Sequence, residues 1–94
     1  MNEPMHLYLV LAMRTPRFQA QAGEAHQAFL DDLVEQDLLE LTGPFTDGSG
    51  GAYILRATDL ATATQIAHTD PLHITGSSML TIHEWRARRP VPKD

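Results

Sequence analysis

The sequence predicts an α+β fold of the ferredoxin-like type, a β-α-β-β-α-β sandwich whose antiparallel sheet carries both helices on one face. Three observations lead to this prediction. Short apolar runs typical of strands are separated by two segments with helical periodicity. A glycine-rich cluster between the second and third runs is typical of a β-hairpin turn. The 94 residues suffice for one modest core and not for two domains.

The first half of the chain supplies a strand, a helix and a second strand. Residues 5–13 are apolar and rich in strand formers, so they predict a buried strand with two apolar faces. Thr15 and Pro16 are typical of an N-cap followed by proline at the first helical position, and they predict a helix over 16–37. The short apolar run 38–42 then predicts the second strand.

A hairpin is predicted in the middle of the chain. Gly43 and Pro44 precede the cluster 46–51, whose Thr-Asp-Gly-Ser-Gly-Gly sequence predicts the turn. Residues 52–57 have the aromatic and β-branched content of the returning strand. We expect Gly43 and Pro44 to serve a tight bend or bulge.

The last third supplies the second helix and the final strand. Thr58 or Asp59 can cap a helix whose apolar residues recur at helical spacing. Asp70 before Pro71 ends this helix, because a residue preceding proline is pushed out of the α region. After a connector, residues 78–85 predict the last strand.

The composition is that of one compact domain. Hydrophobic residues make up 43% of the chain and charged residues 20%. We expect a single domain over 1–94, with its core at about 5–86 and a C-terminal tail at 87–94. The chain has no cysteine, which excludes disulfides, thiolate nucleophiles and thiolate metal sites.

The net charge of −5 argues against a nucleic-acid partner, which would require clustered basic residues. We expect the basic cluster Arg86, Arg88 and Arg89 to be a solvated tail. Met1–Pro4 lacks a basic flank, and the apolar stretch 7–13 is too short for a signal peptide or a membrane span. We therefore expect a cytoplasmic protein with no membrane partner.

A titratable residue occupies the apolar face of the first predicted helix. With about 100° per residue, His26 falls near the centre of an apolar stripe. The stripe consists of Ala22, Phe29, Leu30, Leu33 and Val34. A buried imidazole requires a hydrogen-bond partner, and such surroundings are typical of proton-transfer sites. A core histidine without a catalytic role is the alternative interpretation.

One face of the predicted sheet has no cover within a single chain. Both faces of the first strand are apolar, so this open face would expose a larger apolar patch than monomers usually show. We therefore expect a homodimer in which two sheets pack face to face.

Several segments in order resemble the YciI-like, or YCII-related, family. They are His26–Leu30, Gly43–Phe45 before the turn, Asp70–Leu72 after the second helix, and the strand end at Trp85. The resemblance covers about residues 5–86 and implies a dimeric α+β barrel with a site built on a His and Asp pair. A characterised class of this family eliminates chloride from a chlorinated hydroxyhydroquinone.

The resemblance implies His26 and Asp70 as the catalytic pair. If they meet, the carboxylate fixes the tautomer of the ring and leaves its other nitrogen free to take a proton. Such assistance contributes about 10²–10⁴-fold, enough for proton abstraction beside a carbonyl or enol. The sequence therefore predicts a small dimeric enzyme of lyase or isomerase type that acts on a small aromatic or anionic organic substrate, without metal or cofactor.

The substrate-binding residues are expected around this pair. The family pattern implies an arginine three residues before the helical histidine, where this chain has Gly23. Arg14 or Arg17 could bind an anionic group in its place. The side chains expected to line the pocket are Tyr8, Phe45 and Met79.

Other interpretations of the same residues remain open. Asp70 is also a typical turn residue, whose side chain bonds nearby backbone N–H groups. His68, Asp70 and His73 could offer three metal ligands, although their spacing crosses a helix end and a proline. The alternative function is a small-molecule-binding or structural dimeric module of the same fold, without catalysis.

Overall fold

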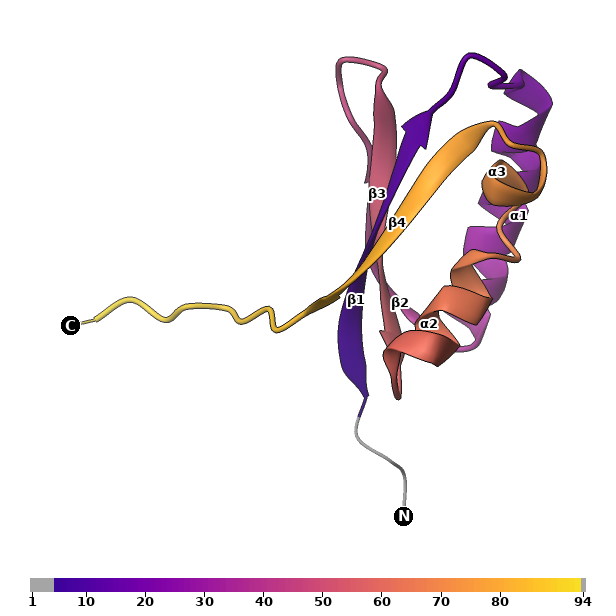
Figure 1. The fold of residues 1–94 in the computed structure, drawn as a ribbon. Helices are drawn as coiled ribbons and strands as arrows, with labels where there is room; N and C mark the ends of the chain where they lie inside the picture. Colours follow the sequence, from indigo (N-terminus) through magenta and orange to yellow (C-terminus); the bar gives the residue numbers. More distant parts are fainter. Residues whose placement is uncertain (1–4, 94) are drawn as a thin grey trace.

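The computed structural model describes residues 5–93, so Met1–Pro4 lies outside the described part of the chain. A four-stranded antiparallel sheet carries all helices on one face (Figure 1). The strands are β1 (His6–Arg14), β2 (Leu39–Pro44), β3 (Gly50–Ala57) and β4 (Ser78–Trp85), in the order β2-β3-β1-β4. The helices are α1 (Ala20–Glu35), α2 (Leu60–Ala67) and the short α3 (Pro71–Ile74). This is the predicted ferredoxin-like α+β sandwich.

The core lies between the helices and the face of the sheet that they cover. Its buried residues are Tyr8, Val10, Leu30, Leu33, Tyr53, Leu55, Ala57, Ala63 and Ala67. The buried residues of α2 are both alanines, which allow this helix to lie close to the sheet. A second, smaller cluster of Ala12, Ala22 and Leu72 joins α1, α3 and β1 near the end of β1.

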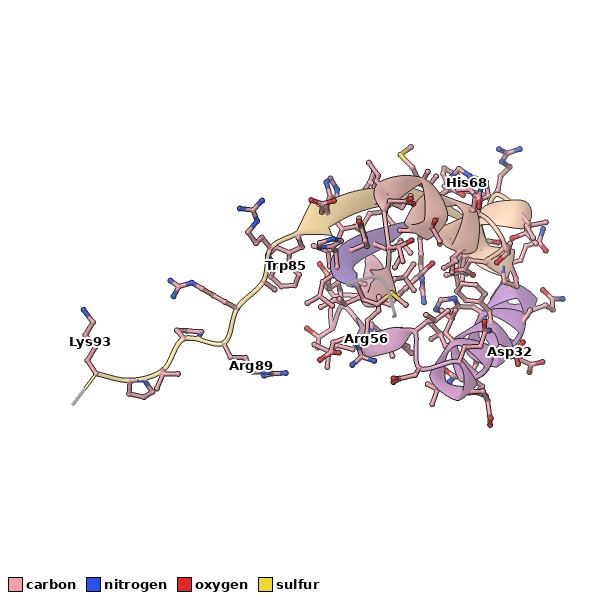
Figure 2. All side chains as sticks on the ribbon, turned by 90° about the horizontal axis from the view of Figure 1, so that it is seen from below. Asp32, Arg56, His68, Trp85, Arg89 and Lys93 are labelled. Atoms are coloured by element: carbon pink, nitrogen blue, oxygen red, sulfur yellow. The ribbon has the colours of Figure 1, made fainter. Side chains whose placement is uncertain are left out.

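The other face of the sheet is apolar and open. Paired residues of neighbouring strands point to the same face, so the pairs Leu9 with Ile54 and Met13 with Met79 place apolar side chains there. The large apolar residues of this open face are Leu7, Leu9, Leu11, Met13, Leu41, Ile54, Met79 and Trp85. Beyond Trp85 the tail leaves the sheet and runs away from the helices, carrying Arg89 and Lys93 (Figures 1 and 2).

The first helix begins later than predicted. α1 starts at Ala20, and Thr15 is not its N-cap, because the Thr15 hydroxyl lies 2.6 Å from the carbonyl oxygen of Gly76. The backbone N–H of Gln19, the residue before the helix, donates to the Ser77 hydroxyl at 3.2 Å. The segment between β1 and α1 is thus held by residues some sixty positions further along the chain, which local capping signals cannot reveal.

Two further expectations differ from the structure. Val34 was expected on the buried stripe of the first helix, but it is 60% exposed, because α1 buries a narrower stripe of Ala22, Leu30 and Leu33. The connector before the last strand contains a helical turn, α3, because Asp70 accepts a hydrogen bond from the Leu72 N–H at 2.9 Å and so caps it. No helix in the described part of the chain is long and apolar enough to cross a membrane.

Candidate acid–base site

His26 and Asp70 meet between α1 and the start of α3. The Nδ1 atom of His26 lies 2.9 Å from Oδ1 of Asp70 and 3.0 Å from Oδ2. The Asp70 side chain is fully buried, whereas 19% of the His26 side chain is exposed. The residue pattern explains Asp70 locally: Pro71 occupies the first turn of α3, and the preceding aspartate turns its carboxylate back to cap that turn.

The buried Asp70 carboxylate is surrounded by hydrogen-bond donors. Besides His26 Nδ1, the Tyr53 hydroxyl donates to Oδ2 at 3.0 Å and the Leu72 N–H donates to Oδ1 at 2.9 Å. An ionised carboxylate only accepts hydrogen bonds, so its two oxygens can serve all three donors at once. Their convergence satisfies a charge that would otherwise be costly to bury.

This arrangement fixes the tautomer of His26. Because the carboxylate only accepts, Nδ1 carries the hydrogen of the neutral ring and Nε2 holds the lone pair. No described side-chain nitrogen or oxygen is buried without a partner, and the hydrogen bonds of the His26 ring are made through Nδ1. Nε2 is therefore accessible and able to accept a proton.

Two aromatic rings pack beside the imidazole. The ring centroids of Phe29 and Tyr53 lie 6.1 Å and 5.8 Å from that of His26. Burial, followed by the nearby Asp70 charge and hydrogen bond, raises the pKa of Tyr53 above its usual value. Tyr53 thus remains a protonated donor to Asp70, and it binds Oδ2 whereas the backbone of α3 binds Oδ1.

A cavity of about 360 Å³ adjoins the histidine. It lies between α1 and the covered face of the sheet, and the β2–β3 hairpin forms part of its wall. The lining residues with polar side chains are Arg14, His26, Gln27, Thr42, Tyr53 and Ser78. Arg14 is the only cation among the lining residues of the described chain, and its guanidinium lies 4.1 Å from the centre of the Phe18 ring.

The other residues expected around the substrate lie elsewhere. Tyr8 is buried and donates a hydrogen bond to Glu84, and it does not line the cavity. Phe45 lies in the hairpin turn and Met79 on the open face, both outside the cavity lining. Met79 points away from the cavity. It pairs with Met13, whose side chain points to the open face because the side chains of β1 alternate between the two faces of the sheet.

Sequence reasoning missed Tyr53. Its strand was predicted, and a tyrosine on the covered face of a strand needs a partner for its hydroxyl. The alternation of β3 places Tyr53 on the same face as Leu55 and Ala57, which are buried. That alternation could have identified Tyr53 as a polar core residue, but not Asp70 as its partner.

The structure does not bring His68, Asp70 and His73 together as a metal site. In the described residues no group of three or more histidine or acidic side chains could hold a metal ion. The rings of His68 and His73 stack in parallel with centroids 4.3 Å apart, and Asp70 faces His26 instead. His68 is exposed at the end of α2 (Figure 2).

Comparisons with known proteins agree with this fold. The YCII-related domain matches residues 6–86. The uncharacterised protein YjpA of Bacillus subtilis is 45% identical over 85 residues, which cover 90% of this chain and all of YjpA. The structure also resembles 5-chloro-2-hydroxyhydroquinone dehydrochlorinase from Burkholderia phenoliruptrix, solved in complex with 2,5-dihydroxybenzoquinone. The TM-score is 0.67 at 19% identity, over 85% of this chain and 93% of that chain. The chain therefore belongs to the YCII-related family.

Proposed function

We propose that this protein is a small enzyme of lyase or isomerase type in which Nε2 of His26 removes a proton from the substrate. The observation that supports this proposal is the hydrogen bond from His26 Nδ1 to the fully buried Asp70 carboxylate, beside a cavity. Asp70 orients the ring and stabilises the imidazolium that forms. Tyr53 and the Leu72 N–H hold Asp70 in place.

The chemistry requires a carbon whose proton is already acidic. General base assistance of about 10²–10⁴-fold suits a carbon beside a carbonyl or an enol. In an isomerase the imidazolium returns the proton to another atom of the resulting enolate. In a lyase the electron pair left by the proton instead expels a leaving group, such as chloride, from the adjacent carbon. Both outcomes regenerate neutral His26, the second after the imidazolium releases its proton to water.

The substrate class follows from the size and charge of the cavity. A volume of about 360 Å³ is near the lower end of the range for small-molecule sites, which suits a single ring. Arg14 would bind an anionic group of that ring. The similar dehydrochlorinase, whose structure contains 2,5-dihydroxybenzoquinone, makes chlorinated hydroxyhydroquinones the first substrates to test.

We further propose that the protein acts in the cytoplasm as a homodimer, joined through the open face of its sheet. Leu9, Leu11 and Ile54 lie at the centre of that face, and Met79 and Trp85 extend it along β4. Thr81 and His83 lie on the same face between Met79 and Trp85, beside Leu11 and Leu9. The apolar surface over β1, β3 and the two ends of β4 favours association. Light scattering should then give a mass twice that of the 10.4 kDa chain.

The proposal is tested by His26→Asn, with His68→Asn as the matched control. Chloride release from chlorinated hydroxyhydroquinones, and deuterium exchange into unchlorinated enolisable analogues, measure the two reaction types. We expect His26→Asn to lower the rate by about 10²-fold or more, because the base is lost. His68→Asn should retain the wild-type rate, since His68 lies outside the cavity.

The same experiment distinguishes an enzyme from a non-catalytic small-molecule-binding module. An enzyme requires that turnover disappears with His26 while the fold persists. Turnover that survives in His26→Asn would contradict the proposal. Ligand binding without turnover in the wild-type protein would favour the non-catalytic module.

A further inference from the structure

We infer that Gly23 determines which molecules reach His26. Its missing side chain keeps the α1 wall of the cavity open beside the imidazole. Gly23 and His26 both line the cavity, and they lie three residues apart on one face of α1. This inference rests on the proposed function, since it concerns which ligands reach the proposed catalytic base His26.

The direction of side chains on a helix makes Gly23 a neighbour of the imidazole. Side chains of an α-helix lean toward its N-terminus, so each covers the turn before its own Cα. The ring of His26 therefore leans toward the turn that contains Gly23. A side chain at position 23 would stand at the edge of the space in which a ligand meets His26.

That space is empty of protein atoms. A Cβ atom built on Gly23 meets nothing within 4 Å. The contrast with the hairpin glycines is sharp: a Cβ on Gly51 would lie 2.7 Å from the Gly43 carbonyl oxygen, and one on Gly50 would collide with the backbone of Ala12. Close backbone packing explains glycine at positions 50 and 51, but it does not explain glycine at position 23.

Helix stability does not explain Gly23 either. Glycine is among the least favourable residues inside a helix, and Gly23 is neither a cap nor in a left-handed conformation. Alanine would fit without a clash and favour the helix. The neighbouring Gln27 also lines the cavity, and its side-chain amide donates to Asp31 at 3.2 Å, one turn toward the C-terminus.

The walls around this opening indicate the shape of the ligand. Gly23 of α1 and the hairpin residues Gly43, Pro44 and Gly51 line the cavity with little or no flexible side chain. Such walls suit a planar ring, and Arg14 supplies a positive charge for an acidic substituent on it. The ligand class assigned to the site is therefore a planar, acidic, single-ring compound, which a larger side chain at position 23 would exclude.

The test measures access to His26 directly. Diethyl pyrocarbonate acylates unprotonated imidazole nitrogens, and peptide mass spectrometry reports the rate for each histidine. We compare the wild-type protein with Gly23→Ala and Gly23→Leu. Ala25→Leu is the matched control, because Ala25 is an exposed residue of the same helix that does not line the cavity.

We expect Gly23→Leu to slow acylation of His26 about tenfold, with Gly23→Ala between it and the wild type. The rates of His68, His73 and His83, which lie outside the cavity lining, should not change in any variant. Ala25→Leu should leave the His26 rate unchanged. Gly23→Ala should also raise the melting temperature by roughly 4 °C, which shows that lost access does not come from unfolding.

A His26 rate in Gly23→Leu equal to that of the wild type would overturn the inference. Equal slowing in Ala25→Leu would overturn it as well, since the effect would then not belong to position 23. Acylation of His26 requires only that the reagent reaches the ring, and it does not depend on enzymatic turnover. The inference can therefore succeed where the proposed reaction fails, and the two failures are distinguishable.

Discussion

Two tyrosines on the covered face of the sheet make the same hydrogen bond in different surroundings. The Tyr53 hydroxyl donates to Asp70 at 3.0 Å, and the Tyr8 hydroxyl donates to Glu84 at 3.1 Å. Both phenol rings are buried. Asp70 is fully buried and accepts from His26 and the α3 backbone as well, whereas Glu84 is exposed and accepts from Tyr8 alone among the described side chains.

The comparison shows that a tyrosine and carboxylate pair does not by itself make a site. At Tyr8 the hydrogen bond satisfies a buried hydroxyl, and neither partner lines a described cavity. At Tyr53 the same bond fixes a carboxylate that in turn holds a titratable ring against a cavity. The difference lies in the burial of the carboxylate and in the third partner, His26.

Neutralising each carboxylate should separate the two tyrosine–carboxylate pairs most strongly. We expect Asp70→Asn to lower the free energy of unfolding by about 2–3 kcal/mol, because the new amide brings a donor to a point where only donors converge. Glu84→Gln should change it by less than about 0.5 kcal/mol, since that side chain is exposed. Urea unfolding measures the free energy of unfolding of both variants. Similar losses in Asp70→Asn and Glu84→Gln would contradict the contrast between the two tyrosine–carboxylate pairs.

The two hydroxyls give the next largest difference. Tyr53→Phe should cost about 1–2 kcal/mol, because it removes a donor from the buried Asp70 charge. Tyr8→Phe should cost about 0.5–1 kcal/mol, since water can replace the donor at Glu84. Turnover should fall in Tyr53→Phe and remain at the wild-type level in Tyr8→Phe. A loss of turnover in Tyr8→Phe would show that the two pairs are coupled.

Alkaline pH should have the smallest effect on the free energy of unfolding, and this effect should depend on Tyr53. Burial raises the pKa of Tyr53 above the unfolded value of 10.0, and Asp70 raises it further. Folded Tyr53 therefore keeps a proton that the unfolded chain releases above about pH 10. Stability from this group is fully present below that pH and is lost as the pH rises beyond it.

The decline should be about 1 kcal/mol between pH 10 and 11, and it should be shallower in Tyr53→Phe. Burial and Glu84 also raise the pKa of Tyr8, so a residual decline remains in that variant. Urea unfolding at several alkaline pH values measures the slopes. Identical slopes in the wild-type protein and Tyr53→Phe would contradict the raised pKa of Tyr53.

Local patterns were sufficient to predict most of the fold. Apolar runs placed the strands, and Asp59 caps α2 as one of the two predicted residues, accepting from the Thr62 N–H at 2.7 Å. The start of α1 could not be predicted, because Thr15 is held by Gly76 and Ser77 across the molecule. Long-range hydrogen bonds leave no trace in local periodicity.

The residues of the candidate site could be predicted only where the sequence carried a local signal. His26 stood out because an imidazole interrupted an apolar helical stripe, and Asp70 because it preceded a proline and matched a family motif. Tyr53 fits its strand, and the alternation of that strand marks it as a polar core residue, but it does not point to Asp70, which lies 17 residues away in another element. The aromatic and sulfur side chains of Tyr8, Phe45 and Met79 suit a ligand pocket, but chemical type alone does not tell which face or end of a sheet a residue occupies.

The ring-nitrogen chemical shifts of His26, measured by NMR, test the central claim most directly. We expect neutral His26 to carry its hydrogen on Nδ1 and a lone pair on Nε2, because the Asp70 carboxylate only accepts hydrogen bonds. Asp70→Asn should abolish this preference, and the exposed His68 supplies a reference within the same spectrum. A hydrogen found on Nε2 of His26 in the wild-type protein would contradict the assignment of that atom as the base.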